Sequence, residues 1–177
     1  MRVIQPIAKL DLAFSLFCLQ HRYNMPVARL SKSISHTGDG HLYAVMGLLA
    51  WWLDSAHGLI FLTLGLLSFA IELPIYWVLK NSFQRRRPQE FSSLVTAYIT
   101  PSDRYSLPSG HTAAAFVMAT LIGYIYPHWY ALAIIWAGLI GFARVLLGVH
   151  FVSDVLAGAL LGIGSATYAI TVVEKAI

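Results

Sequence analysis

Cysteine and charged residues are scarce in this sequence of 177 residues. Cys18 is the only cysteine, which excludes an internal disulfide and a cysteine cluster for zinc. Charged residues make up 11% of the chain, against about 25% in soluble domains, and hydrophobic residues make up 58%. Together with a mean hydropathy of +0.66, these values predict one membrane-embedded domain covering residues 1–177.

Long apolar segments dominate the sequence. Four of them are long enough, or nearly so, to cross a bilayer as a helix, which takes about 20 residues. They are residues 58–79, 111–126, 129–147 and 151–173. Residues 42–53 form a fifth, shorter segment. The predicted fold is therefore all-α, a polytopic membrane helix bundle of five or six spans whose helical core covers residues 41–177.

Residues 1–40 differ from this core because apolar and basic residues are mixed in residues 5–33. We expect residues 5–33 to form an interfacial amphipathic helix, and a sixth, imperfect span is the alternative. Lys9 and Asp11 interrupt the apolar run and no small-residue cleavage site follows it. The segment is therefore interpreted as retained, not as a removed signal peptide.

The lengths of the connections predict which loops share a membrane face. The short turns at 54–57 and 127–128 must lie opposite the long segment 80–110, so residues 1–40, 80–110 and 144–150 meet on one face. Eleven of the twelve Lys and Arg residues fall there, and the net charge is +4. Because these charges lie between apolar segments, they favour lipid headgroups or a phosphate-bearing ligand over nucleic acid. The positive-inside rule would place this face in the cytoplasm, but charges needed for catalysis leave its side open.

Three clusters of polar residues come together on this face. They read KNSFQRRRP at 80–88, PSGH at 108–111 and RVLLGVHFVSD at 144–154. Cations near hydrocarbon are costly, and an oxyanion ligand would account for them. Lys80 offers a point charge, whereas Arg87 and Arg144 offer planar forks that match phosphate oxygens. Ser109 and Gly110 stand where a helix begins, so their free backbone N–H groups can hold a further oxygen.

The histidines add chemistry that phosphate binding alone would not require. His150 and Asp154 are four residues apart, which on a helix places them on one face. The carboxylate can hold one imidazole nitrogen and leave the other as a nucleophile, while His111 can act as a general acid. Three cations would balance the charge of a phosphoryl group between the histidines. No metal ligand set is evident, and we expect neither a metal nor another cofactor.

These clusters resemble the signature of the type 2 phosphatidic acid phosphatase superfamily: KxxxxxxRP, PSGH and SRxxxxxHxxxD. The first two match completely, and the third matches except that Ala143 replaces the usual Ser, which removes a hydroxyl contact to phosphate. The resemblance implies a multi-pass membrane phosphatase with a metal-free phosphohistidine mechanism. It assigns His150 as the nucleophile, Asp154 as its partner and His111 as the acid. The phosphate-binding residues that it implies are Lys80, Arg87, Ser109, Gly110 and Arg144.

The small size and the N-terminal LDLAFSLF and ISHTGDG sequences are similar to those of compact bacterial members. Those include phosphatases of undecaprenyl diphosphate, phosphatidylglycerophosphate and lipid A, which the motifs do not separate. The resemblance thus implies a bacterial inner membrane and a membrane lipid as substrate. A lipid phosphotransferase is one alternative. A transporter or non-catalytic lipid-phosphate binder is another, although binding would not need His150 and Asp154. Vanadate-dependent peroxidases share the pocket, but they are soluble.

Several further polar residues lie outside the roles that the resemblance assigns. Arg85 and Arg86 are assigned to lipid headgroups. Glu72 lies inside a span, where it either serves function or pairs with a basic residue to fix the bundle. Asp39, Asp103 and Arg104 are interpreted as solvated loop residues, and a role in shaping the entrance of the site is the alternative. Histidines interpreted as interfacial, without partners at ligand spacing, are His36, His41, His57 and His128. Residues 89–107 are expected to form a lid or a substrate-recognition segment.

Overall fold

The computed structural model of the protein describes residues 4–20 and 24–176, and every regular element within these ranges is helical. In chain order the helices are α1 (Ile4–Leu19), α2 (Asn24–His36), α3 (Gly40–Leu53), α4 (Gly58–Phe83), α5 (Pro88–Phe91), α6 (Gly110–Ile125), α7 (Tyr130–Leu146) and α8 (Val152–Ala176), with a 3₁₀ turn, Pro127–Trp129, before α7. The all-α prediction is confirmed. Each of the five apolar segments forms a helix, and Arg2 and Arg22 of the basic face lie outside the described residues.

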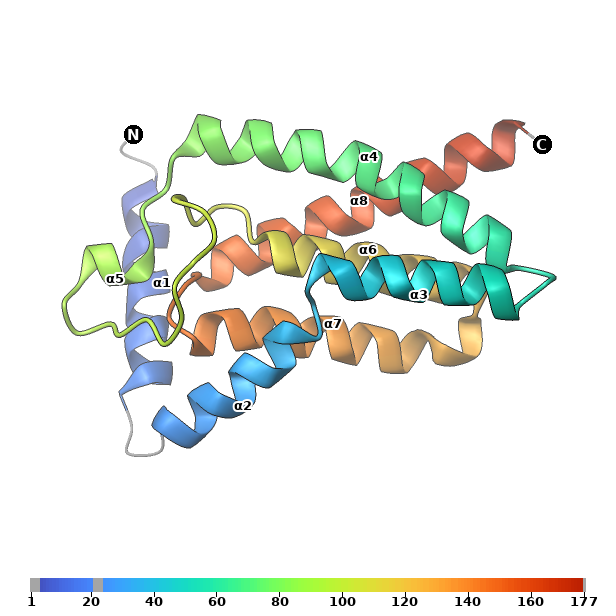
Figure 1. Ribbon diagram of the computed structural model, residues 1–177. Coiled ribbons are helices and arrows are strands. Elements are labelled where there is room, and N and C mark those ends of the chain that lie inside the picture. The colour runs from blue at the N-terminus through green and yellow to red at the C-terminus, as the bar shows by residue number, and fades with distance from the viewer. Residues whose placement is uncertain (1–3, 21–23, 177) are drawn as a thin grey trace.

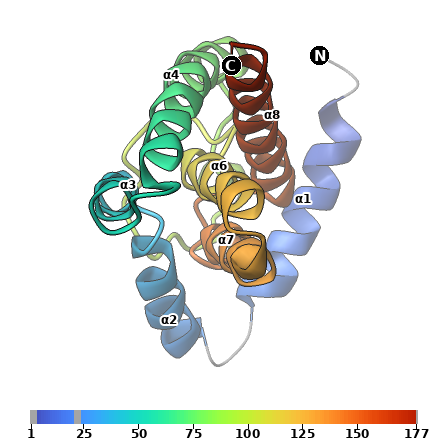
Figure 2. The same cartoon turned by 90° about the vertical axis from the view of Figure 1, so that its right-hand side faces the viewer.

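Helix α6 occupies the centre of the bundle, with α3, α4, α7 and α8 around it (Figure 2). Its sequence GHTAAAFVMATLIGYI is rich in small residues, and much of its surface is buried. On α8, a Cβ added at Gly158 would lie 2.5 Å from the carbonyl oxygen of Ser109, and one at Gly162 would lie 2.2 Å from that of Ala113. Glycine at these positions lets α8 approach α6 closely, as small residues do in membrane bundles.

The two short turns lie at the same end of the bundle, as their lengths predict. The hydroxyl of Tyr126 donates a hydrogen bond of 2.9 Å to Asp54 Oδ2, which joins the α6–α7 turn to the α3–α4 turn. The longer connections, α4–α6 and α7–α8, lie at the opposite end (Figure 1). The predicted grouping of loops is therefore confirmed, and the three sequence clusters share one end of the molecule.

The N-terminal segment differs from its prediction because it forms two helices, α1 and α2, instead of one. Asn24 opens α2 and Pro26 stands in its first turn, where proline is tolerated. Helix α1 crosses the end of the bundle that carries the clusters and runs across the axes of α7 and α8 (Figure 1). Its Asp11 is buried. An orientation across the bundle suits a helix in the membrane interface, which stays a prediction.

The outer surface of the bundle is strongly apolar. Large exposed side chains on its long helices include Leu66, Leu73, Trp77, Leu132, Ile135, Leu156 and Leu160. Soluble monomers rarely expose apolar patches of this extent. Three helices are long and apolar enough to cross a membrane, within Gly58–Phe91, Pro127–Leu146 and Val152–Lys175, whereas α3 and α6 are shorter apolar helices. The number of five or six spans therefore remains a prediction.

Candidate active site

Lys80, in the last turn of α4, is buried and shares a polar cluster with the half-buried Tyr76 and Asp103. Its Nζ donates to Tyr76 Oη and to Asp103 Oδ2, each at 2.6 Å, and the Tyr76 hydroxyl donates to the same carboxylate oxygen at 2.5 Å. Burial acts to raise the pKa of Asp103, but the hydrogen bonds from Lys80 and Tyr76 and nearby positive charges lower it overall. Asp103 is therefore ionised at neutral pH, and its interpretation as a solvated loop residue is wrong.

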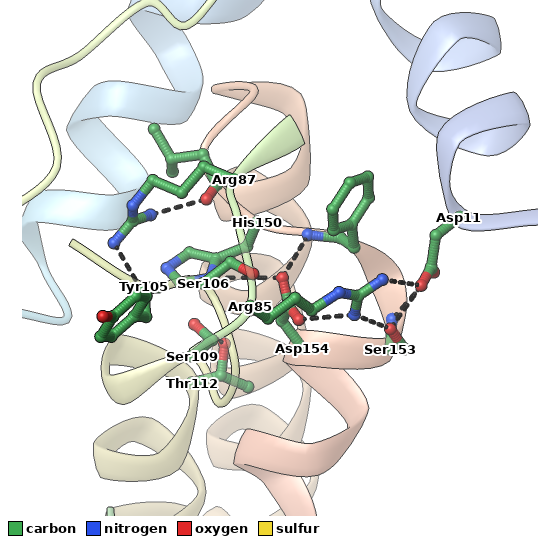
Figure 3. Close-up of polar contacts among 12 residues, drawn as sticks. Asp11, Arg85, Arg87, Tyr105, Ser106, Ser109, Thr112, His150, Ser153 and Asp154 are labelled. Carbon is green, nitrogen blue, oxygen red and sulfur yellow. Dashed lines mark hydrogen bonds and ion pairs between the residues drawn. The ribbon is translucent and has the colours of Figure 1, made fainter. Parts of the chain in front are cut away.

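Arg87 is held in position by hydrogen bonds to two later segments of the chain. It directly precedes Pro88, whose ring suits the first turn of α5. Its guanidinium donates to the Val149 carbonyl at 2.7 Å and to the carbonyls of Asp103 and Tyr105 at 2.9 and 3.1 Å, and also contacts the Asp103 carboxylate. Arg87 thus ties the 103–105 loop to the segment that carries His150 (Figure 3).

Ser109 and Gly110 form the start of α6 and are held by both neighbouring long helices. Ser109 donates its backbone N–H to the Asp154 carbonyl at 3.0 Å, and its hydroxyl accepts from Thr112 at 2.9 Å. A Cβ on Gly110 would come within 3.0 Å of the Tyr76 ring, so only glycine fits without displacing that ring. The PSGH cluster is therefore packed directly beside the Lys80 cluster.

His111 follows in the first turn of α6, with its side chain 27% exposed. Its Nε2 lies 3.0 Å from Asp39 Oδ1, at the end of the α2–α3 connection. The other oxygen of Asp39 lies 2.5 Å from His36 Nδ1. His36 therefore has a partner, and the interpretations of Asp39 as solvated and of His36 as unpartnered are wrong.

His36, Asp39 and His41 offer ligand atoms that all lie within 4.8 Å of one another. This combination of two imidazoles and a carboxylate could hold a metal ion such as zinc. The spacing of the three residues, HTGDGH, was visible in the sequence. Asp39 also contacts His111, so an ion bound by the three residues would share Asp39 with His111.

Arg144 lies in the last turn of α7 and is only 5% exposed. Its Nη1 donates to the Ser35 hydroxyl at 2.8 Å, which attaches α2 to α7. Its Nε has no hydrogen-bond partner among the residues the structure describes. A buried guanidinium N–H without a partner is costly, and an oxyanion ligand would satisfy it.

His150 lies in the short connection between α7 and α8, two residues before α8 begins. It is therefore not on the helix that carries Asp154, as the spacing of four had suggested, yet its Nδ1 still approaches Asp154 Oδ2 to 3.7 Å. The chain turns there because Gly148 has a φ of +72°, which L side chains rarely adopt. Burial lowers the pKa of His150 to about 4, although Asp154 acts to raise it. The imidazole is neutral at pH 7, so a ring nitrogen is available as a nucleophile.

Asp154 is held by a network that the sequence did not reveal (Figure 3). Arg85 donates to Asp154 Oδ1 at 2.7 Å and to Asp11 Oδ2 at 2.7 Å. Asp11 also accepts from the Ser153 hydroxyl at 2.5 Å, and Asp154 Oδ2 accepts from the Phe151 N–H at 2.8 Å. The assignment of Arg85 to lipid headgroups is therefore wrong, whereas Arg86 is exposed. Arg85 instead fixes the carboxylate behind His150 and connects it to α1.

Two cavities of opposite character meet at His111 and Arg144. One is apolar, with a volume of about 370 Å³, and runs between α3, α4 and α6 from His150 towards Phe61. The other has a volume of about 800 Å³, and its polar lining comes from α2, the 98–102 segment and Arg144. Lys80 and Arg87 line neither cavity directly. They reach the apolar one through Asp103, which forms part of its wall.

Comparison with known proteins places this geometry in a family. The PAP2 superfamily model matches residues 58–177, which is more than half of the chain. Phosphatidylglycerophosphatase B of Bacillus subtilis is 37% identical over 111 residues, which cover 56% of this chain and 52% of that protein. An undecaprenyl-diphosphatase of Sulfolobus acidocaldarius is 35% identical over 97 residues, covering 54% of this chain and 47% of that protein. The matches thus span about half the length of these relatives.

A solved structure extends the similarity over nearly the whole chain. The crystal structure of Aquifex aeolicus LpxE superposes with a TM-score of 0.80 and 25% identity, covering 92% of this chain and 95% of that one. The family predicted from the three motifs is confirmed.

Proposed function

Because the chain belongs to the PAP2 superfamily, we propose that it is a multi-pass membrane phosphatase that hydrolyses a lipid phosphate or diphosphate. The observation that carries this proposal is the junction of an apolar and a polar cavity at His111 and Arg144. An amphiphile bound there places its tail in the first cavity and its headgroup in the second. Its phosphate then lies between the two histidines. The names of the relatives, which include phosphatidylglycerophosphatase and undecaprenyl-diphosphatase, support this class of substrate.

The first step of the proposed reaction uses His150 as the nucleophile. Its Nδ1 side faces Asp154, so Nε2 attacks phosphorus, and the bond from phosphorus to the lipid oxygen breaks. His111 protonates that oxygen as it leaves. Asp39 holds Nε2 of His111, so Nδ1 is the nitrogen that transfers the proton.

In the second step His111 acts in the opposite direction, as a base. A water molecule attacks the phosphohistidine, His111 takes the proton from the water, and inorganic phosphate and free His150 are released. Arg144, Lys80 and Arg87 stabilise the phosphoryl oxygens, together with the backbone N–H of Gly110 at the start of α6. The backbone N–H of Ser109, expected to be free, is instead donated to the Asp154 carbonyl. A lipid acceptor in place of water would give a phosphotransferase, and a product assay with added diacylglycerol separates the two.

This proposal requires no metal ion, which gives its first test. Purified protein is assayed for phosphate release from undecaprenyl diphosphate, phosphatidylglycerophosphate, phosphatidate and lipid A. We expect turnover of at least one lipid to survive an excess of EDTA and to be inhibited by vanadate, which mimics the transferring phosphoryl group. Loss of activity in EDTA with rescue by one divalent ion would contradict the mechanism. Zinc is included in the rescue series because His36, Asp39 and His41 could bind it.

A second test concerns Asp103, whose carboxylate already accepts hydrogen bonds from Lys80 and Arg87. A phosphate that binds to these cations has to replace the carboxylate. Asp103→Asn removes the competing charge, so we expect vanadate to inhibit this variant at a concentration about tenfold lower, equivalent to about 1.4 kcal/mol. The comparison is the vanadate inhibition constant of the wild type and the variant at pH 7.

The matched control is Glu90→Gln, which removes an exposed negative charge from nearby α5. It should leave vanadate inhibition nearly unchanged, because exposed charges are screened. Weaker inhibition of Asp103→Asn would show that the carboxylate positions Lys80 for phosphate and does not compete with it.

A further inference from the structure

The apolar cavity contains one acidic residue that the proposed reaction does not use. Glu72 lies on α4, deep in the bundle, and its side chain is only 2% exposed. It lines the cavity together with apolar neighbours such as Phe69, Leu73 and Met118. Within residues 4–20 and 24–176 it makes no hydrogen bond or ion pair, so of the two alternatives for Glu72 the pairing with a basic residue is absent. Burying an unpaired polar group is costly, and an unpaired carboxylate is the costliest form.

The position of Glu72 relates it to the reaction centre. Glu72, Tyr76 and Lys80 are spaced four residues apart and so share one face of α4. Tyr76 lies against Gly110 and holds Lys80 and Asp103. Glu72 is one turn deeper in the bundle than Tyr76, which is about 5.4 Å along the helix axis. A phosphorylated lipid therefore passes Glu72 a few covalent bonds below its phosphate.

Lipid classes differ at that depth. In a diacylglycerol phosphate the acyl ester carbonyls lie a few bonds from the phosphate, and each carbonyl can accept a hydrogen bond. In a polyprenyl phosphate only hydrocarbon lies there, and Glu72 would remain without a partner. A site that hydrogen-bonds its substrate discriminates strongly against an analogue that lacks the matching group.

We propose that Glu72 is a specificity residue that donates a hydrogen bond from its carboxylic acid to an acyl ester carbonyl of the substrate. The preferred substrate class is thus a phosphorylated diacylglycerol lipid, ahead of a polyprenyl phosphate. The inference rests on the proposed phosphatase function and names the substrate class of the same site.

The experiment compares three monophosphates in detergent micelles: dioleoyl phosphatidate, its dialkyl ether analogue, and a polyprenyl phosphate. The ether analogue keeps the phosphate, glycerol and chains but lacks the carbonyl. We expect the wild type to have kcat/KM about tenfold higher for the ester than for the ether, the value of one hydrogen bond. Glu72→Leu should lose about tenfold on the ester alone, whereas Glu72→Gln, which keeps a donor, should retain the ester preference.

A matched control comes from Ser68, another buried polar residue of α4, one turn deeper than Glu72 and outside the cavity lining. Ser68→Ala should leave the ester-to-ether ratio unchanged. Equal losses of Glu72→Leu on all three lipids would overturn the proposal, as would a wild type without ester preference or a Glu72→Gln variant inactive on every lipid. Failure of the phosphatase function itself looks different, because the wild type would then release phosphate from none of the three.

Discussion

Replacing His150 with alanine is expected to abolish lipid phosphate hydrolysis, with a loss of more than about 10⁴-fold in kcat. Loss of a nucleophile that forms a covalent intermediate removes the whole pathway, and knocking out such groups in other hydrolases has effects of this size or larger. His150 is buried at 3% exposure and its pKa of about 4 keeps it neutral, so a ring nitrogen is available to attack phosphorus. Turnover is measured as phosphate release from the best lipid of the panel.

The intermediate can be trapped directly. Acid-labile radiolabelled phosphate should appear on the wild type after rapid quenching and should be absent from His150→Ala. Asp154→Asn serves as the comparison, because it keeps the side-chain shape but removes the negative charge beside the imidazole and opposite Arg85. That variant should be slowed but should still become labelled. A His150→Ala protein with near wild-type turnover would end the phosphohistidine hypothesis.

The helices and the site motifs were predictable because both depend on short-range patterns. Apolar runs of nearly span length can only be helices in a bilayer, where every backbone polar group must be satisfied within the segment. The turn lengths then determined which loops share an end, and the hydrogen bond between Tyr126 and Asp54 agrees. His150 was expected on the helix of Asp154, but the chain turns at Gly148, which has a positive φ, and α8 begins only at Val152.

The network behind His150 was missed for a different physical reason. Arginines after an apolar helix usually bind headgroups, and Asp11 was interpreted as an interruption of an apolar run. Nothing local indicates that Arg85 and Asp11, 74 residues apart, form an ion pair. The same holds for Asp39 and His111, which are 72 residues apart. Buried charges generally need partners, so an acid in an apolar segment, which required a basic partner somewhere in the fold, is the signal that was available.

Loop residues were the hardest to predict. Asp103 occupies a long irregular segment, where polarity alone indicates solvent exposure. Only the fold brings it to Lys80 and Arg87, because Ser106 donates hydrogen bonds from its backbone N–H and its hydroxyl to the carbonyls of Arg85 and Arg86. The segment 89–107 lines the polar cavity through residues 98–102, which agrees with a recognition role but does not test one.

Replacing His111 with alanine is expected to slow hydrolysis by about 10²–10⁴-fold, the usual range for general acid catalysis. His111 is the histidine at the junction of the two cavities, and its Nε2 contact with Asp39 leaves Nδ1 as the nitrogen that transfers the proton. The label on His150 should therefore still form in His111→Ala, only more slowly. That result separates the acid from the nucleophile, since a variant of either residue alone reports only a loss of turnover.

The size of the loss should depend on the leaving group, which tests the role of His111 most directly. A monophosphate releases an alkoxide that needs a proton, whereas a diphosphate releases a lipid phosphate that is already a good leaving group. Farnesyl phosphate and farnesyl diphosphate share one tail, so the ratio of their losses isolates this chemistry. We expect His111→Ala to lose at least tenfold more kcat on the monophosphate. Equal losses on both would mean that His111 positions the phosphate and does not protonate the leaving oxygen, because a contact to the transferred phosphoryl group is the same in the two substrates.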